Sequence, residues 1–278
     1  MIEPLLSVRN MTKRFGGLVA VNNVSFAINR GEVVGLLGDN GAGKSTLIKC
    51  ISGVHHADEG EIFFDGKPVR FSRPIDARRH GVETIYQDLA LANNLDVGAN
   101  IFLGREVKKS HFGGVIKTLD ERHMLRESRQ TLDFLQIHFP TLTEPIESLS
   151  GGQRQAVAIA RAVYWDAKLM IMDEPTNNLG VPEQRKVLDL IRRLRERGVP
   201  VILITHILPD AFAVADRLIV MHRGRKVAEK ATAGTNTEEL IRYMVGASDD
   251  MSEDGALSAT RETQGLCGPI WRYSLSIV

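Results

Sequence analysis

The chain has 278 residues, only two cysteines and almost no net charge. Cys50 and Cys267 cannot form a disulfide framework or a cysteine-rich metal site, and this scarcity is typical of a reducing compartment. The formal net charge is +1, so the chain lacks the basic excess that attracts nucleic acid. Arg78-Arg79 and Arg192-Arg193 have acidic neighbours, which favours solvated faces over a nucleic-acid site.

Long apolar runs and internal repeats are also missing, and we expect no leader. No window has the roughly 18 uninterrupted apolar residues that a transmembrane helix needs. Residues 1–4 lack the basic-then-apolar pattern of a signal peptide. We therefore expect the chain to reach a membrane only through a partner. Because no segment repeats, we expect one nucleotide module per chain.

The most specific motif is the glycine-rich stretch GDNGAGKST, which lies between the apolar runs 32–37 and 47–51. A buried strand, a glycine-rich turn and a helix, in that order, form the context that a phosphate-binding loop requires. Its glycines let several backbone N–H groups point at one anion, and Lys44 can reach the outer phosphates. The Ser45 hydroxyl can bind Mg²⁺. The candidate phosphate-binding residues are Gly38, Asp39, Asn40, Gly41, Ala42, Gly43, Lys44, Ser45 and Thr46.

Polar residues follow three other apolar runs that we expect to be strands. In open α/β sheets, ligands bind at the carboxyl ends of the strands. Asp173 and Glu174 follow 168–172, so Asp173 would hold Mg²⁺ and Glu174 would polarise an attacking water; the alternative is a pair of helix-capping acids. Gln87 would sense the nucleotide and its metal, unless it is a loop amide facing water. His206 would contact the outer phosphate, unless it is a packed loop histidine.

At two further sites, the residues alone allow two interpretations. Phe15 stands beside two glycines on a predicted turn, where it is either an exposed platform for a base or a core residue at a strand end. Ser150 is a good N-cap, followed by Gly151, Gly152 and Gln153 at the start of a helix. Exposed N–H groups there would make a second anion site, and the alternative is an ordinary capped helix.

Periodicity and turn residues predict an α/β chain. Apolar residues at helical spacing between about 95 and 163 indicate a helical insertion between sheet strands, with a loop at 110–118. Thr237 is expected to cap the last helix, and residues 247–265 have the composition of a disordered segment. The predicted strands are 5–12, 19–28, 61–69 (a hairpin around Asp65-Gly66), 82–86, 168–173, 199–204, 217–221 and 226–229; the predicted helices are 74–80, 96–103, 120–136, 150–164, 182–197 and 237–245.

These motifs together resemble those of ABC-type ATPases. The stretch 38–46, Gln87, the pentapeptide LSGGQ at 149–153, the run 169–174 and His206 match the Walker A, Q-loop, signature, Walker B and H-loop in that order. The resemblance implies a P-loop NTPase core with a mixed, mainly parallel sheet, an N-terminal antiparallel β subdomain and an inserted α-helical subdomain at about 95–165. It implies a nucleotide-binding domain over 1–246 and a tail at 247–278. Phe15 then matches the adenine-stacking aromatic, and ATP with Mg²⁺ is the implied ligand.

Three further stretches look like the ATPase subunits of bacterial monosaccharide importers of the fructose, ribose and xylose kind: 82–89, 100–106 and 176–181. That resemblance implies a homodimer on the cytoplasmic face of the cell membrane. Its partners would be integral membrane permease subunits and, indirectly, a periplasmic sugar-binding protein. Most ABC ATPases have an Asp where this chain has Gly180, which puts in doubt the cross-subunit contact made by that Asp. The alternative function is a soluble ABC ATPase acting on DNA or ribosomes.

Overall fold

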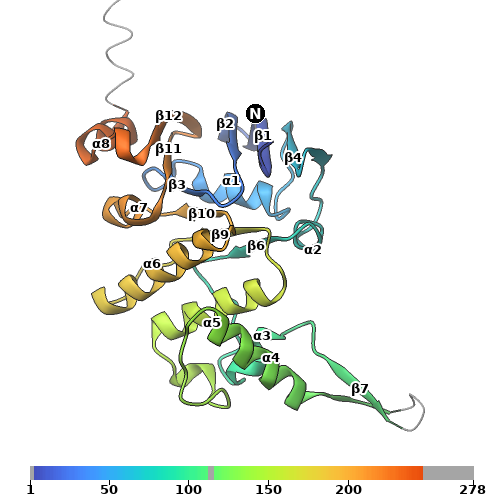
Figure 1. Cartoon of the computed structure of the whole chain (residues 1–278). Helices are drawn as coiled ribbons and strands as arrows, with labels where there is room; N and C mark the ends of the chain where they lie inside the picture. The colour runs from blue at the N-terminus through green and yellow to red at the C-terminus, as the bar shows by residue number, and fades with distance from the viewer. Residues whose placement is uncertain (1–2, 112–115, 247–278) are drawn as a thin grey trace, which may run out of the picture.

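The computed structural model describes residues 3–111 and 116–246 (Figure 1). A six-stranded sheet in the order β12-β11-β3-β10-β9-β6 forms its centre. The five strands from β11 to β6 are parallel, and β12 pairs antiparallel at one edge. These strands are β3 (Val33–Leu37), β6 (Val82–Ile85), β9 (Leu169–Asp173), β10 (Val201–Ile204), β11 (Arg217–His222) and β12 (Arg225–Ala231).

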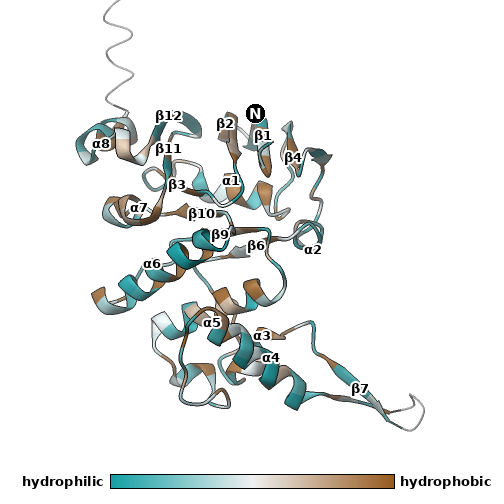
Figure 2. Cartoon of the chain, in the orientation of Figure 1, coloured by the Kyte–Doolittle hydropathy of each residue, from teal (hydrophilic) through white to brown (hydrophobic). Residues whose placement is uncertain are grey.

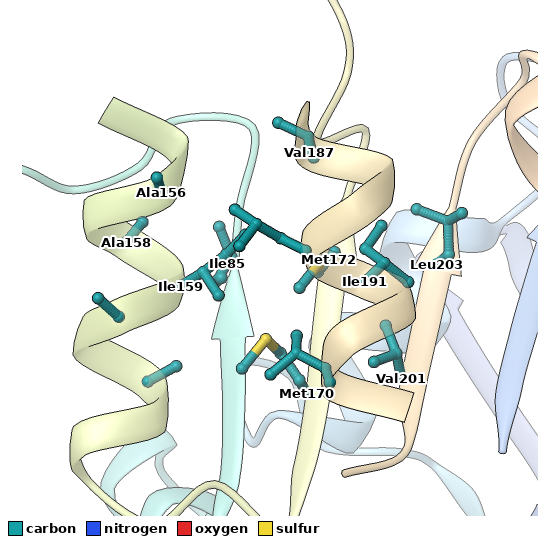
Figure 3. Packing of buried hydrophobic residues seen from close by; sticks show 14 of the residues in the cluster. Ile85, Ala156, Ala158, Ile159, Met170, Met172, Val187, Ile191, Val201 and Leu203 are labelled. Carbon is teal, nitrogen blue, oxygen red and sulfur yellow. The ribbon is translucent and has the colours of Figure 1, made fainter. Parts of the chain in front are cut away.

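The central strands are buried on both faces, which explains their unbroken apolar sequences. In β3, Val33 and Leu37 belong to one hydrophobic cluster, whereas Val34 and Leu36 belong to the other. Figure 3 shows the first cluster, in which side chains of two helices meet those of β6, β9 and β10. These helices are α5 (Gly151–Tyr164) and α6 (Val181–Glu196). As predicted, α6 buries Val187, Leu188, Ile191 and Leu194.

The second cluster lies between the central sheet and a four-stranded antiparallel sheet in the order β2-β1-β4-β5. Helix α1 (Lys44–Ile51) contributes to this cluster and follows β3 directly. Asp65 and Gly66 form the predicted hairpin turn, both with positive φ. The antiparallel strands are β1 (Leu6–Phe15), β2 (Leu18–Ile28), β4 (Glu59–Phe64) and β5 (Lys67–Val69). The short helix α2 (Pro74–Arg79) precedes β6.

The predicted helical insertion consists of α3 (Val97–Ile101), α4 (Glu121–Phe134) and α5, which pack against one another. Met124 and Leu132 of α4 face this core, and its outer face is polar (Figure 2). Phe102 packs against Tyr164 with 4.5 Å between ring centroids, and the Trp165 indole donates to the Ile101 carbonyl at 3.1 Å. Aromatic contacts therefore join α3 to the C-terminal end of α5.

Two local predictions were wrong, and one helix was missed. Residues 110–118 were expected to be a loop, but β7 (Lys108–His111) and β8 (Ile116–Leu119) pair antiparallel into an arm, and residues 112–115 lie outside the described residues. Its exposed, lysine-rich strands lack the apolar alternation that signals a half-buried strand. Helix α7 (Leu208–Val214) was not predicted; its Pro209 occupies the first turn, where proline is tolerated. Asn236, not Thr237, caps α8 (Thr237–Val245).

Helix α8 packs against β11. The expected tail, residues 247–278, lies outside the described residues. Within 3–111 and 116–246, every helix is too short or too polar to cross a bilayer.

Candidate nucleotide site

The strand order places four predicted segments side by side. Strands β3, β10, β9 and β6 are neighbours, and their carboxyl ends lead into the Lys44 loop, His206, Asp173-Glu174 and Gln87 respectively. These residues are far apart in the sequence, and parallel pairing brings them to one edge of the sheet.

The loop between β3 and α1 has a backbone that only glycine can adopt at two positions. Gly43 has φ 98° and Gly38 has φ 149°. A Cβ at Gly43 would collide with the Ala20 carbonyl oxygen, and one at Gly38 with that of Met221. The loop can therefore curl tightly against β2 and β11.

Lys44 opens α1 and is buried. Its Nζ donates to the carbonyl oxygens of Gly38 at 2.8 Å and Asp39 at 3.0 Å, so the loop folds around the ammonium. Burial lowers the pKa of Lys44, and the carboxylates of Glu174, Asp173 and Asp39 oppose that shift. The carbonyl oxygens of the loop and these carboxylates thus offset part of the cost of burying the ammonium.

A hollow of about 510 Å³ lies over this loop. It is lined by residues 40–46, Phe15, parts of β2, Glu174 and the turn Arg223-Gly224. Phe15 is 45% exposed, so it is not a core residue at a strand end. Its ring meets His55 edge to face with 5.3 Å between centroids. An aromatic platform at one side and a cationic loop at the other suit a purine nucleotide with a phosphate chain.

The two acids at the end of β9, Asp173 and Glu174, do not cap a helix, because α6 begins only at Val181. Burial raises the pKa of Asp173, and so does the Glu174 charge; Lys44, Lys49 and the Ser45 hydroxyl lower it. Glu174 has φ 49°, a left-handed conformation that is uncommon for a residue other than glycine. This arrangement leaves Asp173 near the loop and turns Glu174 into the hollow.

Both oxygens of Glu174 are held by neighbouring side chains. His206 Nδ1 lies 3.1 Å from Oε1, and Asn177 Nδ2 donates to Oε2 at 2.9 Å. The Glu174 backbone N–H donates to the Ile204 carbonyl oxygen at 2.9 Å. These contacts fix the carboxylate between two loops. Asn177 was not among the predicted residues. Its position three residues after Glu174 was the only feature of the sequence that could have indicated this contact.

Gln87 is exposed and lines a second hollow, of about 340 Å³, with Glu174 and Gly151. Glu174 therefore stands between the two hollows. Arg161 of α5 donates to the carbonyl oxygens of Leu89 and Ala90 at 2.9 Å each, which attaches the Gln87 segment to the helical insertion. Arg161 was also missed, since an arginine inside a helix carries no motif.

Ser150 caps α5 as predicted. Its Oγ accepts from the Gln153 backbone at 3.3 Å, and the Gln153 side chain accepts from the Ser150 N–H at 2.9 Å. Ser150, Gly152 and Gln153 line a third hollow with Glu183 of α6, not the hollow over Lys44. The two predicted anion sites of one chain thus open into different hollows.

Residues 21–177 match the family model described as ABC transporter. The chain belongs to the ABC transporter family. As a member, it is an ATP-binding chain that hydrolyses ATP. A xylose/arabinose import ATP-binding protein of Sulfolobus acidocaldarius is 52% identical over 243 residues, 87% of this chain and 94% of that protein. A fructose import ATP-binding protein of Rhizobium meliloti is 42% identical over 253 residues, 90% of this chain and 97% of that protein.

Solved structures of ABC ATP-binding cassettes share this fold. A nucleotide-free cassette from an ABC transporter matches with a TM-score of 0.74 and 27% identity, over 88% of this chain and 96% of that one. A dimeric cassette in a post-hydrolysis state, bound to ADP and Pi, matches with a TM-score of 0.68 and 25% identity, over 83% of this chain and all of that one. The predicted fold class, an ABC ATPase with an antiparallel β subdomain and an inserted helical subdomain, is confirmed.

Proposed function

We propose that this chain is the ATP-hydrolysing subunit of a membrane importer for a simple sugar. Support comes from the two relatives described above, whose names specify import of pentoses or fructose and whose lengths this chain nearly spans. The chain has a net charge of only +1, which gives no support to the alternative of an ATPase acting on nucleic acid.

We further propose that two copies sandwich two ATP molecules, and one observation carries this step. Lys44 and Ser150 of the same chain line different hollows, so one chain offers two incomplete halves of a phosphate site. Phosphoryl transfer needs positive charge and N–H donors all around the terminal phosphate. A second copy would supply the helix mouth at 150–153 to the first copy's loop at 38–46.

Within the pocket, the contacts support the following roles. Phe15 stacks on the adenine, and Lys44 exchanges its bonds to Gly38 and Asp39 for bonds to phosphate oxygens. Glu174 accepts a proton from the attacking water, and its two side-chain contacts hold the carboxylate in one orientation. His206 contacts the terminal phosphate from the neighbouring strand end. Gln87 reports the state of this phosphate to the helical insertion.

The donor set fits Mg²⁺. The Ser45 hydroxyl and the Asp173 carboxylate are hard oxygen donors. Burial and the Glu174 charge raise the pKa of Asp173 because they disfavour its negative charge, and a bound cation would offset that cost. Among the described residues, no group of three or more His, Cys, Asp or Glu side chains could hold a metal by itself. That is typical of Mg²⁺, which binds through one or two protein oxygens together with substrate phosphates. The bound ion would neutralise charge on the phosphates.

The helical insertion at about 95–165 would contact the permease, within a nucleotide-binding domain of 1–246. The chain would then sit peripherally at the cytoplasmic face of the cell membrane, and a periplasmic sugar-binding protein would act through the permease. Gly180 caps α6 without a side-chain hydrogen bond, so any cross-subunit contact there would use the backbone.

Reconstitution with candidate sugar permeases tests the function. We expect ATP turnover to rise when the matching permease and its binding protein loaded with a pentose or fructose are present, and Glu174→Gln to abolish the rise. Stimulation by DNA or ribosomes, with none by permease and sugar, would support the alternative.

A further inference from the structure

A buried carboxylate, Asp210, fastens the segment that follows Glu174. Asp210 lies in the first turn of α7, and only 4% of it is exposed. Its Oδ2 accepts a hydrogen bond of 2.6 Å from Thr176 Oγ1, and its Oδ1 accepts one of 2.7 Å from Gln184 Nε2. Both donors are neutral, so hydrogen bonding compensates the burial of this carboxylate.

Asp210 joins the two ends of the segment that follows Glu174 to the segment that follows His206. Thr176, which is 3% exposed, lies two residues after Glu174, and Gln184 lies in α6, just beyond the end of the same segment. Asp210 itself follows His206 by four residues. One carboxylate therefore determines the separation of the two loops that meet at the catalytic edge.

The separation of these loops matters because side chains from both of them contact the Glu174 carboxylate. Asn177, next to Thr176, donates to Oε2, and His206 lies 3.1 Å from Oε1. Glu174 also has a left-handed backbone, and such a conformation persists only when its surroundings hold it. A loop that loses its attachment at Thr176 would let both contacts lengthen.

We propose that Asp210 is a positioning residue for ATP hydrolysis: through Thr176 and Gln184 it holds the Glu174 and His206 loops at the distance that orients the Glu174 carboxylate. The inference rests on the role proposed for Glu174. It assigns the effect to hydrogen bonds, so the negative charge itself is dispensable.

Four single variants separate the hydrogen bonds from the charge. Asp210→Ala breaks both bonds, and Thr176→Val breaks one with little change of shape. Asp210→Asn keeps both bonds once the Gln184 amide turns its oxygen toward the new NH₂ group, and Thr176→Ser keeps the hydroxyl. We expect Asp210→Ala and Thr176→Val to lose about 10- to 100-fold in kcat, because small misplacements of a reacting group cost that much.

The two conservative variants should stay within about threefold of wild type, and KM for ATP should be unchanged in all four, because the Lys44 loop is untouched. Thermal denaturation gives the folded fraction, so that kcat is expressed per folded molecule. Asp133→Asn, an exposed residue of α4, is the control for the same change of charge. If Asp210→Ala does not fold, the kcat values of Thr176→Val and Thr176→Ser test the inference in its place.

The same changes are then made in the Glu174→Gln variant, and its residual turnover is measured. A purely structural defect would lower this turnover further, whereas an effect that acts through Glu174 would not. If Asp210 acts through Glu174, the Thr176→Val change should not reduce the residual turnover of Glu174→Gln any further. Full kcat in folded Asp210→Ala or Thr176→Val, beside an inactive Glu174→Gln, would overturn this inference alone. Normal turnover in Glu174→Gln would overturn the proposed role of Glu174. A rise in KM at constant kcat would also overturn the inference.

Discussion

The division of each ATP site between two copies can be tested by mixing two inactive variants. Lys44→Met removes the ammonium that the loop holds through Gly38 and Asp39. Ser150→Asp places a negative charge at the mouth of α5, where the partner's phosphates would bind. Asp is as good an N-cap as Ser, so α5 should remain stable. Ser150→Asn keeps the cap without the charge and is the matched control.

The expected recovery of ATP turnover follows from which residues line each hollow. In a mixed pair, one site combines both altered elements, and the other combines an intact Lys44 loop with an intact Ser150 helix mouth. Equal amounts that pair at random give mixed pairs about half of the time, each with one working site of two, so about a quarter of wild-type turnover should return. Each variant alone should be nearly inactive.

The assay is phosphate release at a fixed total protein concentration, with the ratio of the two variants varied. Turnover should pass through a maximum at equal amounts, and a mixture of Lys44→Met with Ser150→Asn should be more active still. No recovery at any ratio would refute a shared site, and so would full turnover by Ser150→Asp alone. Either result would mean that one chain completes its own pocket.

Three further predictions concern single side chains. Glu174→Gln should bind ATP normally but barely hydrolyse it, measured by nucleotide binding and phosphate release; normal turnover would remove Glu174 from the mechanism. Burial raises the folded-state pKa of Asp173, so its stabilising contribution is present at low pH and is lost as the pH rises through that pKa. Asp173→Asn should therefore raise the Tm of the nucleotide-free protein at about pH 7, with a gain that shrinks toward about pH 4, and an unchanged Tm would contradict this. Phe15→Leu should weaken ATP binding about tenfold while binding of inorganic triphosphate stays constant, and Phe15→Trp should preserve both; equal losses for the two ligands would exclude stacking.

Much of the site could be predicted from the sequence because its elements are local. A glycine-rich turn between a strand and a helix, or acids after an apolar strand, are recognisable within about ten residues. The general rule that ligands bind at the carboxyl ends of parallel strands then indicated that Gln87, Glu174 and His206 belong together. The strand order confirmed that they follow neighbouring strands.

Contacts between distant segments could not be predicted in this way. The bonds of Glu174 to Asn177 and His206, and those of Asp210 to Thr176 and Gln184, depend on how β9, β10, α6 and α7 pack. An ordinary Asn, Thr or Gln carries no sequence pattern that reveals its partner. The exposed arm β7–β8 was missed for a related reason, since strands without a buried face have no apolar alternation.

The sequence by itself therefore determined which candidate groups this protein has and in what order: a glycine-rich loop, the carboxylate proposed for Mg²⁺, the carboxylate proposed as general base, and a capped helix proposed as a second anion site. Only the tertiary structure decided which of these share a hollow, and it separated Lys44 from Ser150. The physical reason is that motif chemistry depends on a few adjacent residues, whereas the shape of a pocket depends on the packing of whole strands and helices.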